Sequence, residues 1–352
     1  MSADQGAAEQ VAALRQGAGA RLLGRDVFAV RGDDAEAYLQ GQLSQDIVGL
    51  AVGDTTDSLL LQPDGKLNTL LRVTRTEPQG FVLDTDAGFG DAMVARLKKF
   101  LLRSKVEVER LEWRCLALRG SGVDRALAGA VAGAGTGTGT GILLLPFEWN
   151  GWSGIDLLGP REAVVDPASG TLPEGVVFCT AEAFEACRIA SGIPAMGSEL
   201  TDRTIAAEAG LVERTVSFTK GCYTGQELVA RLEARGTNVP RHLVGVVGGS
   251  DPEGERLAFG MTLHAASAAG APAPGADDVA ADKVVGTVTS AAWSPELGAW
   301  AALAYVHRSV PSPGPVRVRS GDGVGGAQPA QVAPLPLVDL VPLVDLAPRP
   351  PG

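Results

Sequence analysis

Residues 218–236 read F-T-K-G-C-Y-T-G-Q-E-L-V-A-R-L-E-A-R-G, a glycine-rich turn followed by a run of helical character. Gly221 and Gly225 let the backbone turn tightly or approach a ligand closely. Cys222 therefore lies just before a helix N-terminus, and Lys220, one of only six lysines, is two residues away. A neighbouring cation and the positive end of a helix dipole both favour the thiolate form of a cysteine. The pattern predicts that Cys222 is a reactive, catalytic thiol assisted by Lys220. The alternative is a turn in which Cys222 only fills space.

The other candidates for thiol chemistry are weaker. Three cysteines lie in apolar strands or on a helix face, where inert buried thiols are expected: Cys115, Cys179 and Cys187. No two cysteines have C-x-x-C spacing, so we expect no stably bound metal and no disulfide framework. A thiol protease or acyltransferase needs a histidine base, and no histidine has a recognisable Cys–His context: His242, His264 and His307. Redox exchange, a mixed disulfide or a transient metal contact at Cys222 stays open.

Upstream of the glycine-rich turn, the sequence predicts a first α+β unit over residues 20–112. Two apolar runs flank Pro63-Asp64-Gly65, which is the pattern of a β-hairpin. Further strands and helices follow the order β-α-β-β-β-α-β, which is typical of an α+β unit with an antiparallel sheet. Their expected positions are residues 27–30, 38–47, 59–73, 81–86, 90–102 and 104–111.

The rest of the chain divides into four further segments. We expect a second α+β unit, a signature segment that packs back on the first unit, a small C-terminal β-barrel and an extended Pro-rich tail. Their expected bounds are residues 113–200, 201–242, 243–320 and 321–352. The glycine- and threonine-rich stretch at 133–141 lacks a G-K-[ST] ending and is interpreted as a linker rather than a phosphate loop.

Composition narrows the class of function. The chain of 352 residues has a net charge of −11, which argues against binding nucleic acid by neutralising phosphates. A 45% hydrophobic fraction is ample for packed cores. The first residues lack a basic stretch followed by an apolar core, and no run of 18 apolar residues occurs. We therefore expect a cytoplasmic protein with no membrane partner.

The eight residues K-G-C-Y-T-G-Q-E, Lys220 to Glu227, resemble the signature of the YgfZ family of folate-binding proteins. That family belongs to the glycine-cleavage T-protein (aminomethyltransferase) superfamily. Other blocks of the chain are similar to the family as well, and the resemblance covers about residues 20–320. These blocks are Y-L-Q-G-Q-L-S-Q-D at 38–46, R-x-x-x-G-I-P at 188–194, S-E-L at 198–200, V-x-R-x-x-x-R-G at 229–236 and G-T-V-T-S-A-A-W-S-P at 286–295.

The resemblance implies a three-domain cloverleaf ring with a channel for tetrahydrofolate or another folate. It also implies a role in assembling or repairing iron–sulfur proteins, which would be partners together with the assembly proteins. Phe184 aligns with a position where members of the family can place a tryptophan against the folate, and a core residue is its alternative. Arg188, one turn along the same helix, is expected to meet a carboxylate or the pterin edge, and a structural ion pair is its alternative. The implied signature loop consists of Gly221, Tyr223, Gly225, Gln226 and Glu227, beside Lys220 and Cys222.

The chain departs from the aminomethyltransferases in two places. Asn68 and Thr69 stand where those enzymes have an Asp pair, and an amide cannot supply the carboxylate on which the folate amine relies. The acidic residue of their second domain has no clear match in this chain, because Ile155 occupies the nearest aligned position. We therefore expect a folate-binding accessory protein rather than a working aminomethyltransferase. A folate-dependent one-carbon transferase is the main alternative, and a scaffold with a vestigial folate site is the weaker one.

Overall fold

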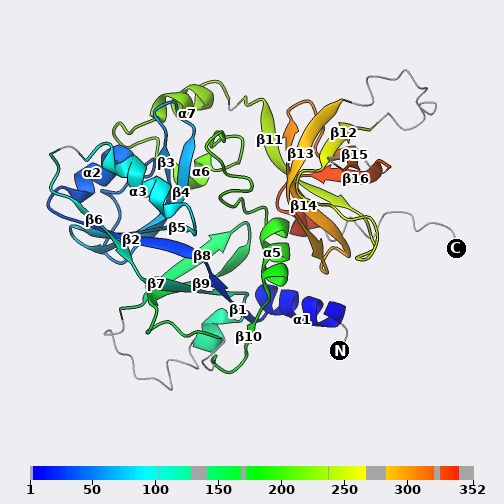
Figure 1. The fold of residues 1–352 in the computed structure, drawn as a ribbon, viewed down its shortest axis with the longest axis horizontal. Helices are drawn as coiled ribbons and strands as arrows, with labels where there is room; N and C mark the ends of the chain where they lie inside the picture. Colours follow the sequence, from blue (N-terminus) through cyan, green and yellow to red (C-terminus); the bar gives the residue numbers. More distant parts are fainter. Residues whose placement is uncertain are drawn as a thin grey trace.

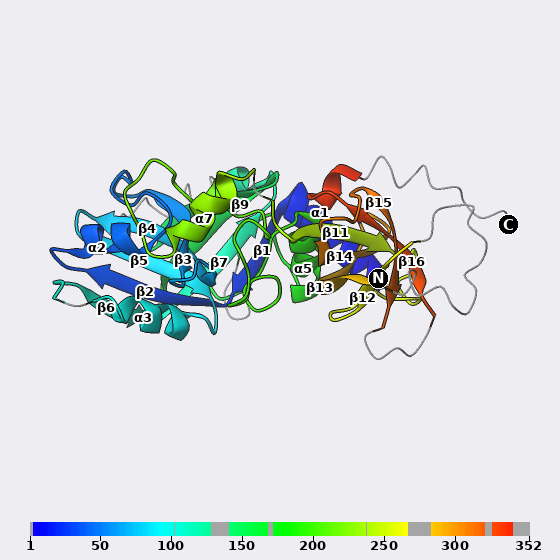
Figure 2. The same cartoon turned by 90° about the horizontal axis from the view of Figure 1, so that it is seen from above.

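The computed structural model describes residues 3–101, 103–127, 141–167, 172–236, 238–266, 283–320 and 326–340. Two five-stranded sheets and a closed six-stranded barrel make up its β structure, which confirms the expected α+β class with a small C-terminal barrel. Figure 1 shows the two sheets one above the other, with α5 between the second sheet and the barrel. Seen from above, the sheets form one half of an elongated molecule and the barrel forms the other (Figure 2). No helix among the described residues is long and apolar enough to cross a membrane.

The first sheet has the strand order β3-β4-β5-β2-β6 and is antiparallel throughout. Its hairpin turns at Gly65, where φ is +84°, a value that glycine adopts without a Cβ clash. Two helices cover one face and bury a core that includes Leu39, Leu71 and Met93. The strands and helices are β2 (Arg25–Arg31), α2 (Ala35–Gln42), β3 (Thr55–Leu61), β4 (Leu67–Glu77), β5 (Gly80–Asp86), α3 (Gly90–Lys98) and β6 (Glu107–Leu111).

The second sheet has the order β10-β1-β7-β9-β8, with only the β1–β10 pair parallel. The expected boundary at residue 20 is wrong, because β1 pairs with β7 and so belongs to this sheet. Helix α1 packs against α5, and the buried Trp152 donates a hydrogen bond to Leu14 O. The elements are α1 (Ala3–Arg15), β1 (Ala18–Leu23), β7 (Trp113–Arg119), β8 (Leu143–Trp149), β9 (Trp152–Pro160), β10 (Val176–Phe178) and α5 (Ala181–Ala190).

The barrel extends further along the chain than the sequence predicted. Its last strand, β16, lies inside the expected tail at 321–352, yet it pairs with both β11 and β15 and closes the barrel. Val332 is fully buried there, so a segment that contains Pro329 and two glutamines still supplies a strand. The strands are β11 (Arg241–Gly248), β12 (Thr262–Ala265), β13 (Val284–Ser294), β14 (Ala299–His307), β15 (Gly314–Arg319) and β16 (Gln328–Ala333), followed by the 3-10 helix η1 (Leu337–Leu340).

The segment between α5 and the barrel packs on the first sheet. It carries two short helices, α6 (Val212–Thr215) and α7 (Gln226–Glu233). Tyr223 and Val229 join Leu59, Leu61 and other residues of β3 and β4 in one buried cluster. Residues 133–140 of the predicted linker, and parts of the expected tail, lie outside the described residues.

Candidate functional site

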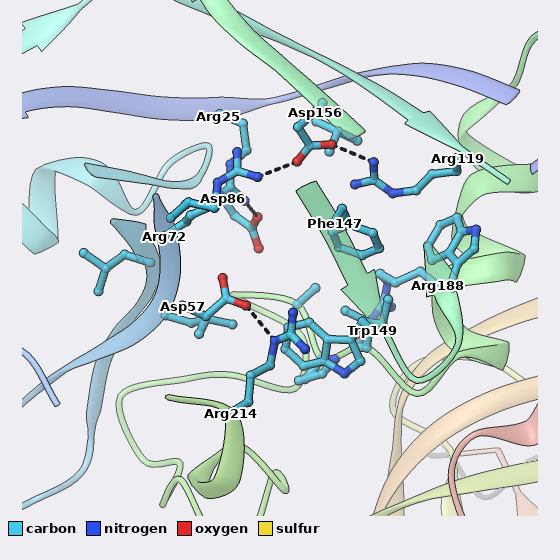
Figure 3. Close-up of a pocket in the computed structure, with 18 of the residues that line it drawn as sticks. Arg25, Asp57, Arg72, Asp86, Arg119, Phe147, Trp149, Asp156, Arg188 and Arg214 are labelled. Atoms are coloured by element: carbon cyan, nitrogen blue, oxygen red, sulfur yellow. Dashed lines mark hydrogen bonds and ion pairs between the residues drawn. The ribbon is translucent and has the colours of Figure 1, made fainter. Parts of the chain in front are cut away.

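A cavity of about 530 Å³ lies between the two sheets, next to α5 (Figure 3). Its walls come from the first sheet at β3 and β4, from the second sheet at β7, β8 and β9, and from α5 and α6. Small-molecule sites commonly have volumes of roughly 300–1,000 Å³. The cavity is therefore large enough for an organic ligand that carries a fused ring.

An alternating chain of ion pairs crosses from the first sheet to the second along the cavity. Arg25 and Arg72 both contact Asp84, at 2.7 and 3.0 Å. Arg72 and Arg119 both contact Asp156, each at 2.7 Å. Burial alone would raise the pKa of Asp156, but the two arginines outweigh burial and lower it to about 2. Asp156 is therefore ionised and already paired, which makes it a structural counter-ion rather than a general base.

Aromatic rings form the opposite part of the cavity wall. Phe147 and Trp149 come from β8, where residues of odd number point toward the first sheet because side chains alternate along a strand. The Trp152 ring lies 5.9 Å from the ring of Phe147 and 4.9 Å from that of Phe184, measured between centroids. These rings give the cavity an apolar side on which a flat ligand could stack.

Arg119 connects the aromatic wall to the ion-pair chain. Its guanidinium carbon lies 3.6 Å from the centroid of the Phe147 ring. Its Nε atom is buried and has no hydrogen-bond partner among the described residues. Buried donors are nearly always paired in folded proteins, so an unpaired donor in a cavity wall suits a ligand that brings an acceptor.

A second arginine holds the aromatic wall near α6. Arg214 donates from Nε to Asp57 Oδ2 at 2.6 Å and from Nη2 to Glu148 O at 2.6 Å. Its guanidinium carbon lies 4.2 Å from the centroid of the Trp149 ring. Figure 3 shows Asp57, Arg214 and Trp149 together at one side of the cavity. None of the three was predicted from the sequence.

Both residues that the resemblance assigned to folate line this cavity. Phe184 is part of the aromatic wall. Arg188 is buried, and its guanidinium bonds Glu185, Glu199, Ser290 Oγ and the carbonyl of Ile193. Because Ser290 belongs to β13, Arg188 joins α5 to the barrel, which is the ion-pair arrangement that the sequence left open.

Sequence reasoning missed the charged core of the site. Ile155 is the residue that the sequence compares with the acidic residue of the aminomethyltransferases, whereas its neighbour Asp156 lines the cavity. The signal that could have found it is a charge inside an apolar strand, as in G-I-D-L-L-G for Asp156 and L-L-R-V for Arg72. Buried charges require partners, so such residues in separate strands predict ion pairs across a packed interface.

The signature loop lies apart from the cavity. None of residues 220–227, all of which the structure describes, lines it. The cavity reaches β3 at Thr55–Asp57, whereas Gly225 approaches the other end of that strand, next to Leu61 and Gln62. Gly225 therefore lies at the end of β3 that is remote from the cavity-lining residues Thr55–Asp57.

Within the signature loop, the cysteine is exposed and the lysine is half-buried. Lys220 Nζ donates to the carbonyls of Gln40, Leu43 and Gln45 at 2.7, 2.7 and 2.8 Å. Burial lowers the pKa of Lys220 to about 8, against an opposing effect of Asp46. Cys222 is the exposed thiol, while the other three are buried.

The two glycines of the loop differ. Gly225 has φ of +85°, and a Cβ there would lie 2.5 Å from Gln62 O. Gly221 has no such constraint, since a Cβ would meet nothing within 4 Å and its φ is not positive. The expectation that both positions need glycine therefore holds for the geometry of Gly225 and is wrong for that of Gly221.

Comparisons with known proteins place the chain in a family. A family model described as the glycine cleavage T-protein C-terminal barrel domain matches residues 258–339, which run from just before β12 into η1. An uncharacterized protein of Haemophilus influenzae is 30% identical over 60% of this chain and 67% of its own length. The tRNA-modifying protein YgfZ of Vibrio vulnificus is 27% identical, over 64% of this chain and 70% of its own.

Aminomethyltransferases are similar over a larger part of the chain. That of Streptomyces avermitilis is 29% identical over 88% of this chain and 83% of its own length. The glycine cleavage system aminomethyltransferase T of Bartonella henselae has a TM-score of 0.74 at 22% identity, covering 95% of this chain and 90% of its own, which shows the shared fold. The chain belongs to the YgfZ family within the glycine-cleavage T-protein superfamily.

Proposed function

We propose that the chain binds a reduced folate in the cavity between its two sheets and acts as an accessory protein for the assembly or repair of iron–sulfur proteins. The observation that carries the folate part is the cavity itself. Its volume of about 530 Å³, its wall of aromatic rings and the unpaired Nε of Arg119 suit a flat, polar-edged ring such as a pterin. Cys222 is the exposed thiol through which we expect contact with clients.

The residues that would hold a folate are those of the aromatic wall and its neighbouring cation. Phe147, Trp149 and Phe184 offer ring faces, and Arg119 offers a donor. A bound reduced folate would supply a nitrogen pair able to carry a one-carbon unit. The chain's own contribution is to stack the ring and to pair its polar edge.

Aminomethyl transfer is the competing function, because relatives with that name cover most of the chain. Asn68 disfavours aminomethyl transfer. Asn68 lies on β4 at a register shift of the β3–β4 ladder, two residues before Leu70, which lines the cavity, whereas Asn68 itself does not. An amide there cannot accept a proton as a carboxylate does. Asp156, the nearest buried carboxylate of the second sheet, is held ionised by two arginines.

Several relatives carry the name tRNA-modifying protein YgfZ. A net charge of −11 disfavours direct binding to the phosphates of tRNA. We therefore propose that any contribution of this chain to tRNA modification passes through a protein partner. An iron–sulfur client is the partner that the proposal implies.

Two assays on purified protein separate the proposal from its competitor. Tetrahydrofolate titrated into the protein gives a saturable, one-site isotherm, and the absence of heat up to about 1 mM ligand (a binding free energy weaker than about −4 kcal/mol) contradicts folate binding. A coupled glycine-cleavage assay with lipoyl carrier protein stays silent. Turnover in that assay would favour the one-carbon transferase.

A complementation assay tests the accessory role. In cells lacking this gene, the wild-type chain restores the activity of an iron–sulfur enzyme, and Cys222→Ala does not. Thr219→Ala, an exposed change three residues away, is the matched control and restores activity. Full restoration of the enzyme activity by Cys222→Ala would show that the thiol is not needed for the accessory role.

A further inference from the structure

The signature loop closes over the C-terminal end of α2. The last carbonyls of any helix lack partners within the helix. Lys220 Nζ bonds the carbonyl of Gln40 at 2.7 Å, and the backbone N–H of Thr224 bonds that of Gly41 at 3.2 Å. Two of the orphan carbonyls of α2 are thus satisfied by residues about 180 positions later in the chain.

The remaining donors of the lysine are used on the segment that follows α2. An ammonium group has three N–H bonds. The second and third donate to Leu43 O and Gln45 O, at 2.7 and 2.8 Å. The ammonium group also lies 5.3 Å from the centroid of the Tyr223 ring. All three N–H bonds of the Lys220 ammonium group therefore donate to backbone carbonyls beneath the loop.

The residues that follow Cys222 are also held in place by contacts with the rest of the chain. Tyr223 is buried, and its N–H donates to Gln226 Oε1 at 3.0 Å. Gly225 rests on the backbone of Gln62 in a conformation that favours glycine. Only Gly221 and Cys222 are exposed between these anchors. The cysteine is consequently the apex of a loop that is tied down on both sides.

We propose that Lys220 is a positioning residue, which clamps the loop to the end of α2 and thereby holds Cys222 out at the surface, instead of activating the thiol as a neighbouring charge. The biological meaning of the clamp rests on the proposed function of Cys222. Sequence proximity predicted that Lys220 activates the thiol, whereas the three hydrogen bonds of its ammonium group go to backbone carbonyls.

The clamp also explains why the position suits lysine. Three carbonyls converge on one compact, tetrahedral ammonium group. The planar guanidinium of arginine directs its donors in a fixed fork and does not match such a cradle. Lys220→Arg keeps the positive charge but cannot bond all three carbonyls in the same geometry. The clamp therefore predicts that Lys220→Arg loosens the loop as Lys220→Met does.

The test measures the mobility of the loop and the chemistry of the thiol separately. Lys220→Met keeps the aliphatic stem and removes the donors; Lys220→Gln is a milder second variant that keeps an amide donor. Lys66→Met, an exposed lysine of the β3–β4 hairpin, is the matched control. Hydrogen exchange is followed in residues 217–224, with β2 and β5 as internal reports of an intact fold, and the rate of Cys222 alkylation is followed as a function of pH.

The clamp predicts that Lys220→Met and Lys220→Arg speed exchange in residues 217–224 by about tenfold or more, that Lys220→Gln has a smaller effect, and that Lys66→Met has none. The midpoint of the alkylation–pH profile stays where it is in the wild type. Unchanged exchange overturns the clamp, and so does a midpoint that moves upward by about one pH unit, since that is the effect of losing an activating charge. Neither readout involves folate or an iron–sulfur client, so the clamp and the proposed function can fail independently.

Discussion

At the scale of single residues, the four thiols divide sharply by burial. Burial raises the pKa of Cys115 and of Cys187 to about 12, and that of Cys179 to about 11. At pH 8 their thiolate fractions are then on the order of one in a thousand or less. Cys222 is exposed. Iodoacetamide should therefore modify one thiol per folded chain, at Cys222.

Mass spectrometry of the native protein after timed alkylation checks this prediction. Denatured protein, in which all four thiols react, is the control. Modification of Cys115 at a rate comparable to that of Cys222 would mean that the buried environment described for Cys115 is not maintained in solution.

The two glycines of the signature loop give a second prediction at this scale. Gly225→Ala places a side chain in a left-handed conformation and against Gln62 O, so we expect it to lower the free energy of unfolding by about 1–2 kcal/mol or more. Gly221→Ala meets open space and should change it by less than about 0.5 kcal/mol. Urea unfolding of both variants measures the difference. Equal midpoints for the two would contradict the geometry of the loop.

Sequence reasoning performed unevenly on these residues. Cys222, which is exposed, came from the glycine-rich motif, and the cavity residues Phe184 and Arg188 came from the family resemblance and the helix that carries both. It assigned Lys220 to the cysteine because the two are neighbours in sequence, whereas the ammonium bonds carbonyls from residues 40–45. Local sequence gives no information about a contact with a segment so distant along the chain.

At the scale of elements, the ion-pair chain that joins the two sheets makes stability depend on pH. The pKa of Asp156 is about 2 in the folded protein, below its value of about 3.9 in an unfolded chain. The stabilisation is therefore present above pH 4 and is lost as the pH falls toward 2, and it amounts to roughly 2–3 kcal/mol.

Asp156→Asn tests this chain of ion pairs. The variant leaves Arg72 and Arg119 buried without their shared counter-ion, so we expect a loss of about 3–5 kcal/mol at pH 7. Its stability should also decline less between pH 4 and pH 2 than that of the wild type. Urea unfolding at several pH values measures both effects. A variant as stable as the wild type at pH 7 would show that the pairs do not hold the sheets together.

The elements that the sequence predicted well are those with strong local patterns. The hairpin around Pro63-Asp64-Gly65 and the helix from Gln226 appear as expected. Helix α1 (Ala3–Arg15), which packs on α5, is not among the elements that the sequence predicted. Its stability comes from tertiary packing, which alanine- and glutamine-rich composition does not reveal.

At the scale of the whole molecule, the barrel depends on a strand that the sequence assigned to the tail. Ending the chain at Gly326 removes β16 and leaves β11 and β15 without a partner on one side. We expect aggregation or loss of cooperative unfolding, because open strand edges associate. Ending the chain at Leu340 retains every described element and should unfold like the full chain. Thermal unfolding of the full chain and the two truncated chains measures the difference. If the chain that ends at Gly326 has the melting temperature of the full chain, the barrel ends near residue 320.

The fold class was predictable because it rests on a long motif and on repeated strand patterns. The cavity was not, because its walls combine α5 and strands from two sheets that meet only in three dimensions. Only Phe184 and Arg188 could be named beforehand, and both lie on α5.

Two phenylalanines allow a direct comparison of whether the cavity between the sheets binds a reduced folate. Phe147 is part of the aromatic wall, whereas Phe259 is 74% exposed on the barrel unit. In calorimetric titration with tetrahydrofolate, Phe147→Ala should weaken binding by about tenfold or more, as expected for the loss of one stacking ring. Phe259→Ala should bind like the wild type. Equal affinities of Phe147→Ala and the wild type, or no binding by the wild type, would contradict folate binding in this cavity.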